Sequence, residues 1–335
     1  MSTFDRVSAC PLEIESCELE GLEQAVSSDF VRRTTVIRLL GDGEVGVGED
    51  VIYDAEEQLR FQAAGPPPEL TGEHTIASFS ELLEDVPEYR RWGFESAALD
   101  LALRQQGVSL HETLGRTPRP VRFVVSTGLG TERTERLRQL PGMRFKLDPT
   151  SDWDEALVAD LVQLDCVDVV DFKEAYTWRE PGRAAPASVY RLVVESLPEA
   201  LIEDPDLGDP AKAAVLEPHH NRITWDAPIH SVADVDGLPF APRTLNSKPS
   251  RFGALRRLLD FYDACAERGI ALYGGGQFEL GPARGQIQYL ASIFHPDAPN
   301  DVAPSGYNRV PVPAGLPRSP LAPAPDRLGF RWLQG

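Results

Sequence analysis

The sequence predicts an α+β unit followed by a barrel of seven or eight (β/α) units. Residues 1–115 show antiparallel strand patterns and helices, whereas strand and helix patterns alternate from residue 116 to 297. Five charged side chains end successive strand patterns of the second part, at near-regular intervals close to the roughly 30 residues of one barrel unit. Because strand ends of a barrel gather at one face, we expect these side chains to form one site. In order, they are Lys146, Asp171, Glu203, Asp226 and Lys248.

The first 115 residues contain the signals of a β-hairpin and of two helices. Apolar runs on both sides of Gly41–Gly43 predict a hairpin within an antiparallel sheet over residues 10–53. A helix is expected after an N-cap at Ser78 or Ser80. Apolar residues at helical spacing predict a second, longer helix over Arg91–Leu114.

The second part begins with a buried strand pattern over residues 121–127 and then alternates between strands and helices. This alternation is typical of a parallel sheet, and the number of units favours a closed barrel over an open sheet. There is no GxGxxG at the first strand–helix turn of this second part and no GxxxxGK[ST] anywhere in the sequence, so a dehydrogenase or P-loop site is excluded. The proline-rich segment 298–335 is expected to pack back on the barrel or on the N-terminal unit.

Composition narrows the class of partner. The 335-residue chain has a net charge of −19 and a pI near 4.7, which disfavours nucleic acid and anionic membranes. It has no secretory signal pattern at its start and no apolar run near the roughly 20 residues of a membrane helix. The four cysteines lack zinc spacing and are interpreted as reduced thiols of a cytoplasmic protein.

Asp171, Glu203 and Asp226 would end three neighbouring strands of such a barrel. Carboxylates this close repel one another unless a cation neutralises them, and Mg²⁺ prefers a few carboxylates together with water and substrate oxygens. A single aspartate at a strand end is more often a helix cap, but the three acids together, in the required strand order, favour a site. The sequence therefore predicts that these acids bind one divalent cation, Mg²⁺.

Lys146 and Lys248 would lie on the second and sixth strands, on opposite sides of the barrel. Two amines that face each other across a substrate suit the removal of a proton from one face and its return to the other. Burial and a nearby cation both lower the pKa of a lysine, which makes a neutral base available near pH 7. Solvated lysines at the rim are the alternative for each residue taken alone.

The motifs around these residues resemble those of the enolase superfamily, in its muconate lactonizing enzyme and o-succinylbenzoate synthase subgroup. Arg144-Phe145-Lys146 resembles the family's Lys-x-Lys, LNSKPSRFG resembles NIKPxRxGG around the sixth-strand lysine, and YGGGQFELG resembles its seventh strand. The resemblance implies a capping domain at 1–115, a modified TIM (β/α)7–8 barrel at 116–297 and a C-terminal segment that packs back on them. It also implies that Asp171, Glu203 and Asp226 are the metal ligands and that a lysine is the base.

Several further residues are expected to contact the substrate. Arg144 stands where the family has a lysine, and Lys173 stands where it often has an asparagine. For Lys173, a salt bridge at the rim is the favoured alternative. The resemblance also places Asp29 and Phe30, in a capping loop, above the barrel mouth and Glu279 at the seventh strand.

The reaction that the resemblance implies is abstraction of the proton α to the carboxylate of a small-molecule substrate, by Lys146 or Lys248. Racemisation or epimerisation, cycloisomerisation and syn-dehydration all remain open. The alternative is a non-catalytic or repurposed metal-binding barrel, because Arg144 and Lys173 depart from the family pattern. His295, Asp297 and Asp301 are assigned to a loop in preference to the site. Oligomeric state is open, since such barrels are often symmetric assemblies.

Overall fold

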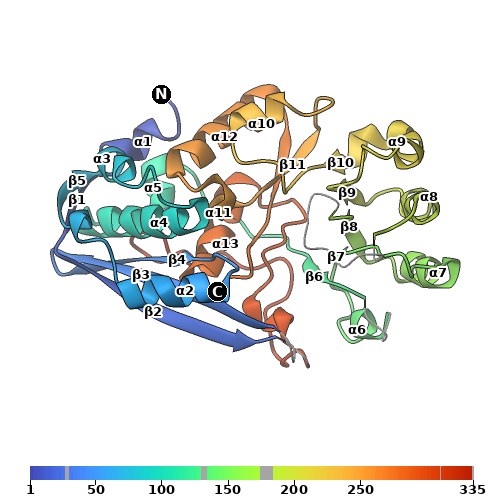
Figure 1. Ribbon diagram of the computed structural model, residues 1–335, viewed down its shortest axis with the longest axis horizontal. Coiled ribbons are helices and arrows are strands. Elements are labelled where there is room, and N and C mark those ends of the chain that lie inside the picture. Colours follow the sequence, from blue (N-terminus) through green and yellow to red (C-terminus); the bar gives the residue numbers. More distant parts are fainter. Residues whose placement is uncertain (27–29, 130–133, 174–183, 310, 334–335) are drawn as a thin grey trace.

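The computed structural model describes residues 1–26, 30–129, 134–173, 184–309 and 311–333. Figure 1 shows the N-terminal sheet and its helices on one side, and the parallel strands β6–β10 with helices α6–α9 on the other. The expected architecture, an α+β unit followed by an α/β barrel, is therefore confirmed.

The N-terminal sheet has three antiparallel strands in the order β2-β3-β4. Asp42 and Gly43, which connect β3 to β4, both have positive φ values, of 49° and 72°. This left-handed backbone is the one that a tight hairpin turn requires, and the expected hairpin is confirmed. A separate strand, β1, pairs antiparallel with β5. The strands are β1 (Pro11–Ile14), β2 (Ser16–Ala25), β3 (Val31–Gly41), β4 (Glu44–Asp50) and β5 (Gly72–Thr75).

Two helix boundaries of this unit differ from those expected. Thr75, not a serine, caps α3, and its side chain and that of Ser78 accept each other's backbone N–H groups. The single helix expected over Arg91–Leu114 is two helices, because Gly107 adopts a left-handed conformation with φ of 68° and Ser109 caps a new helix. The helices here are α1 (Asp5–Ser8), α2 (Ala55–Ala64), α3 (Ile76–Glu81), α4 (Glu88–Gln105) and α5 (Leu110–Leu114), with the 3₁₀ helix η1 (Pro68–Leu70).

Five strands of the barrel form a parallel sheet in the order β10-β9-β8-β7-β6, and β11 pairs in parallel with β12. The amide of Asn246 in β11 donates to the carbonyl of Trp225, just after β10, at 3.1 Å, so the two sheets are continuous. The strands are β6 (Val125–Thr127), β7 (Phe145–Leu147), β8 (Val167–Asp171), β9 (Leu201–Glu203), β10 (Ile223–Thr224), β11 (Thr244–Ser247) and β12 (Ala271–Gly274).

Residues Asn300 and Asp301 close the barrel in the eighth strand position. The amide of Asp301 donates to the carbonyl of Gly274 at 2.7 Å, and that of Val124 donates to the carbonyl of Asn300 at 2.8 Å. The buried side chain of Asn300 accepts from the amide of Gly274 at 2.6 Å and bonds His295 Nδ1 at 2.7 Å. Its Nδ2 also donates to three backbone carbonyls, which fixes this two-residue strand.

The remaining helices cover the barrel. Helix α12 packs inward through Leu255, Leu258, Leu259 and Tyr262, all of which are buried.

Within the described ranges, none of the helices is long and apolar enough to span a membrane. The helices of this part of the chain are α6 (Glu135–Arg138), α7 (Glu155–Leu164), α8 (Ala187–Ser196), α9 (Pro210–Leu216), α10 (Val232–Asp236), α11 (Pro249–Phe252), α12 (Leu255–Arg268) and α13 (Pro282–Phe294), with η2 (Glu217–Arg222) and η3 (Ser305–Asn308).

Two buried charged residues of the N-terminal sheet hold the loop between β12 and α13. Arg32 donates to the carbonyls of Gln277 and Phe278 in this loop at 3.0 and 3.1 Å, and to two carbonyls that follow β4. Glu49 accepts backbone N–H groups at the start of α13, including that of Ala283 at 3.1 Å. The N-terminal unit is thereby fastened to the seventh strand of the barrel.

The C-terminal segment contacts both parts of the chain. Leu321 pairs with Val121, ahead of the first barrel strand, through two backbone hydrogen bonds. Further on, Asp100 of α4 accepts from the amide of Phe330 at 2.8 Å and from Arg331 Nε at 2.6 Å. This segment therefore links the start of the barrel to helix α4.

Candidate metal and catalytic site

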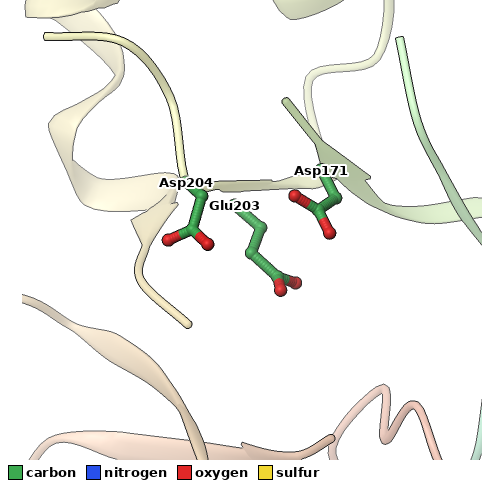
Figure 2. A group of neighbouring side chains, drawn as sticks. All are labelled: Asp171, Glu203 and Asp204. Atoms are coloured by element: carbon green, nitrogen blue, oxygen red, sulfur yellow. The ribbon is translucent and has the colours of Figure 1, made fainter. Parts of the chain in front are cut away.

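Four buried carboxylates meet at the carboxyl ends of β8, β9 and β10. Asp171 and Glu203 end β8 and β9, Asp204 follows Glu203, and Asp226 lies two residues beyond β10. Carboxylate oxygens of Asp171, Glu203 and Asp204 lie within 4.8 Å of one another. Figure 2 shows these three side chains directed to the same side of the strands.

Lys146, on β7, points into this group. Its Nζ lies 2.6 Å from Glu203 Oε1, 3.1 Å from Asp171 Oδ2 and 3.7 Å from Asp301 Oδ2. Burial lowers the pKa of Lys146, but attraction by Asp171 and Glu203 outweighs it and holds this pKa well above its ordinary value. Without a bound cation, Lys146 is therefore an ammonium ion.

Glu203 and Asp204 carry more negative charge than their surroundings stabilise. Glu203 accepts from Tyr273 Oη at 2.7 Å and from Asn246 Nδ2 at 3.3 Å. Even so, burial raises the pKa of Glu203 to about 8, with repulsion from Asp171 adding to the effect. Burial and repulsion from neighbouring carboxylates likewise raise the pKa of Asp204 to about 7. A cation would favour the ionised form of both.

Asp226 is paired with two cationic side chains. Its two oxygens lie 2.7 Å from Lys248 Nζ and 2.7 Å from Arg251 Nη1. Burial would raise the pKa of Asp226, but Arg251 and Lys248 outweigh it and hold this pKa far below its ordinary value. The closest triad of carboxylates thus contains Asp204 in the place where the sequence predicted Asp226. Asp204 also accepts hydrogen bonds from the backbone amides of Asp226 and Ala227, both at 2.9 Å. As a ligand, Asp226 would share its oxygens between the cation and these two partners, since each carboxylate oxygen has two lone pairs.

The donor set fits a hard divalent cation. If all carboxylates are ionised, the described part of this group has two negative charges more than positive ones, since six carboxylates face four cationic side chains. Among the described residues, Asn246 Oδ1 is also buried without a hydrogen-bond partner, beside Glu203. Such oxygen donors are those that Mg²⁺ prefers. The group comprises Asp148, Asp171, Glu203, Asp204, Asp226 and Asp301 with Lys146, Lys173, Lys248 and Arg251.

Lys173 lies beside this group, in a salt bridge. Its Nζ is 2.5 Å from Asp148 Oδ2, and its amide donates to Asp171 Oδ1 at 3.0 Å. The backbone of Lys173 has a positive φ of 52°, which is uncommon for a residue other than glycine. Lys173 therefore forms a salt bridge, with Asp148, which is the alternative that the sequence favoured for this residue.

Arg144 and Glu279 are held apart from the carboxylate group. Arg144 Nε donates to Asp168 at 2.7 Å, and its Nη1 donates to the carbonyl of Asp165, between α7 and β8. Glu279 is buried and pairs with Arg284 at 2.8 Å. The contacts with substrate expected for these two residues have no support from this arrangement, because their charges are already paired elsewhere.

The expected capping-loop residues are only partly described. Asp29 lies outside the described residues. The ring of Phe30 is stacked on that of Tyr53, with centroids 6.5 Å apart, and the guanidinium of Arg32 lies 4.2 Å from the centre of the same tyrosine ring. Phe30 thus belongs to an aromatic pair supported by Arg32, and its contact with substrate stays a prediction.

Four members of the group were not predicted as site residues: Asp148, Asp204, Asp301 and Arg251. Asp204 directly follows Glu203, so the shared strand end was a usable signal. Arg251 follows Lys248 by one turn of α11, inside a motif already singled out. Asp301 carried no comparable signal, because its strand position is too short for an alternating pattern.

Comparison with known proteins gave two matches to family models and a set of relatives. The models are described as the N-terminal and C-terminal domains of DUF8230, a domain of unknown function, and match residues 5–113 and 117–309. An o-succinylbenzoate synthase from Geobacillus kaustophilus is 28% identical over 247 residues, which are 68% of this chain and 64% of that protein. The match therefore spans less than two thirds of that relative's length.

Other similar proteins are named for different reactions. An N-succinylamino acid racemase from an Amycolatopsis species is 28% identical over 281 residues, 76% of this chain and 75% of that protein. Solved structures that share the fold include members of the enolase superfamily. A dipeptide epimerase from Methylococcus capsulatus, solved in complex with a Mg ion, superposes with a TM-score of 0.64 at 21% identity, covering 84% of this chain and 85% of that one.

Proposed function

Because the chain belongs to the DUF8230 family and to the enolase superfamily, as a member similar to o-succinylbenzoate synthase and muconate lactonizing enzyme, we propose that it is a metal-dependent enzyme that removes the proton α to a carboxylate. The observation that carries the proposal is the buried group in which Lys146 and Lys248 contact the carboxylates suited to hold a cation. The substrate is a small carboxylic acid.

We assign Mg²⁺ as the cation and Asp171 and Glu203 as its first two ligands, with Asp204 or Asp226 as the third. The oxygen-only donors and the excess negative charge support this choice, as does the Mg ion of the dipeptide epimerase. A divalent cation bound there would stabilise the negative charge that develops on a substrate carboxylate when its α-proton leaves.

The two lysines divide the proton transfers. One takes the α-proton as a neutral amine, which a nearby cation makes available by lowering the pKa of an ammonium ion. The other either returns a proton to the opposite face, giving racemisation or epimerisation, or stays charged and supports the developing anion, as in syn-dehydration or cycloisomerisation. In syn-dehydration the first lysine passes the abstracted proton to the departing hydroxyl group, which leaves as water. The relatives include both an o-succinylbenzoate synthase and an N-succinylamino acid racemase, so we leave both outcomes open.

The second candidate is a barrel that binds a metal without catalysis. The observation in its favour is Arg144, which departs from the family motif and pairs with Asp168 outside the carboxylate group. Both candidates predict binding of Mg²⁺, so only a chemical step separates them.

Exchange of the α-proton in D₂O, followed by proton NMR with Mg²⁺ present, is the test. N-acyl amino acids, dipeptides and sugar-acid analogues form the substrate library. Lys248→Ala should abolish the exchange, because it removes an amine that contacts the site. Arg138→Ala is the matched control, since Arg138 forms an exposed ion pair with Asp160. Exchange at the wild-type rate in Lys248→Ala would contradict the role of this lysine. Mg²⁺ binding without exchange of any library member would favour the non-catalytic barrel.

A further inference from the structure

Asp301 reaches Lys146 from a different direction than the other acids do. Lys146 lies on β7, and Asp171 and Glu203 belong to the next two strands, β8 and β9. Asp301 lies in the eighth strand position, on the far side of β6, yet its Oδ2 is 3.7 Å from Lys146 Nζ. Its carboxylate is not part of the closest triad, and its side chain is 20% exposed against 3% for Asp171.

Lys146 and a divalent cation compete for the same oxygens. The ammonium ion is 2.6 Å from Glu203 Oε1 and 3.1 Å from Asp171 Oδ2, which are atoms that the cation would bind. Two positive ions repel each other strongly at such distances in a buried site. When the cation binds, the ammonium ion must therefore be stabilised by another negative group.

Asp301 is better placed for this task than Asp148, the nearby alternative. Asp148 Oδ2 is paired with Lys173 at 2.5 Å, and its Oδ1 is buried without a hydrogen-bond partner, but among the described residues Asp148 forms no ion pair with Lys146. Within the described residues, Lys146 is the only cationic side chain that contacts the carboxylate of Asp301. The position of Asp301 is also fixed, because its amide bonds Gly274 and its neighbour Asn300 is anchored by its side chain.

We propose that Asp301 is a positioning residue that holds the Lys146 ammonium ion when a divalent cation takes the oxygens of Asp171 and Glu203. This inference rests on the metal site of the proposed function. Asp301 itself needs no contact with the cation or the substrate. Its carboxylate lets Lys146 stay charged and close to the site while Asp171 and Glu203 exchange the ammonium ion for the divalent cation.

A double-mutant cycle on metal affinity tests the proposal without a substrate. Mg²⁺ affinity is measured by titration calorimetry at constant pH for the wild type, Asp301→Asn, Lys146→Met and the double variant. Asp301→Asn should weaken Mg²⁺ binding by about tenfold, the scale of one charge pair in a partly buried site. In the Lys146→Met background the same substitution should change the affinity by less than about twofold, because the ion to be held is gone.

Two further variants separate this role from a general effect of charge. Asp301→Glu keeps the carboxylate and should restore the affinity to within about threefold of the wild type. Asp297→Asn is the matched control, since Asp297 lies on the same segment but pairs with the exposed Arg119. Thermal unfolding of each cation-free variant verifies the fold, and Asp301→Ser replaces Asp301→Asn if that variant does not fold.

The outcomes distinguish this inference from the proposed function. An equal loss of affinity from Asp301→Asn in both backgrounds, or no loss in the presence of Lys146, would overturn the positioning role and leave the metal site intact. Failure of the wild type to bind Mg²⁺ would overturn the metal site, and this inference with it.

Discussion

Binding of Mg²⁺ at neutral pH should release protons from the carboxylate group. The pKa of Glu203 is about 8 and that of Asp204 is about 7, because burial and neighbouring carboxylates disfavour their ionised forms. At pH 7 Glu203 is then about 0.9 protonated and Asp204 about 0.5, so a cation that requires both as carboxylates displaces about 1.4 protons. At pH 9 both acids are ionised already, and the displaced amount falls to about 0.1 proton.

Calorimetric titration in buffers of different ionisation enthalpy measures this number directly. The observed enthalpy of Mg²⁺ binding should change with the ionisation enthalpy of the buffer at pH 7, and hardly at pH 9. The apparent affinity should rise by about 25-fold per pH unit around pH 7 and level off near pH 9. Glu203→Gln should lower the proton count at pH 7 to about 0.5, whereas Glu199→Gln, at an exposed position, should leave it unchanged. A wild-type proton count near zero at pH 7 would refute the reasoning.

Three further predictions concern stability. Without Mg²⁺, the contribution of Glu203 to the free energy of unfolding is fully present below about pH 4.5 and is lost as the pH rises through about 8, because its folded pKa is raised. Urea midpoints measured with a chelator should fall from pH 6.5 to 8.5, and a rise would contradict this sign. Asn300→Ala should lower the free energy of unfolding by about 3 kcal/mol, since it leaves buried groups at the barrel closure unpaired. A urea titration measures this loss, and a loss under about 1 kcal/mol would contradict the role of Asn300 in closing the barrel. Arg32→Met should cost about 3 kcal/mol in thermal or urea unfolding, because four backbone carbonyls lose their buried charged donor; unchanged stability would show that this link is not needed.

The sequence was most informative where strands repeat and least informative where the barrel closes. Asp171 and Glu203 end β8 and β9 as predicted, because a short buried run followed by an acid is visible in the sequence. Asp301 was assigned to a loop, because a two-residue strand has no pattern of its own and pairs with residues distant in sequence. Local pattern cannot reveal such a pairing.

Arg144 and Lys146 are two positions apart, but only Lys146 contacts the carboxylate group, and the difference has a physical reason. Arg144 and Lys146 belong to one motif, and strand alternation would place both on one face. The pairing of β7 with β8 shifts register between Phe145 and Lys146, and the side chain of Arg144 instead pairs with Asp168. A register shift of this kind redirects side chains and leaves no clear mark in a three-residue strand.

The presence of Asp204 instead of Asp226 in the closest triad also depends on side-chain pairing that the sequence does not show. Both acids lie near strand ends, and strand order together with the family resemblance predicted Asp226 as the third ligand. The structure pairs Asp226 with Lys248 and Arg251, while the amides of Asp226 and Ala227 turn toward Asp204. Which of two neighbouring acids is free to bind a cation depends on side-chain pairing across strands, and that pairing is set by the tertiary structure.

Closure of the barrel by Asn300 and Asp301 has a consequence for the order of folding. The contacts that seal it join Val124 to Asn300 and Gly274 to Asp301, and the first of these pairs spans most of the barrel sequence. Contacts over such long loops form late, because ordering the intervening chain costs entropy before the contact is gained. We therefore expect the acids of β8 and β9 to become neighbours early and the contact between Lys146 and Asp301 to be among the last to form.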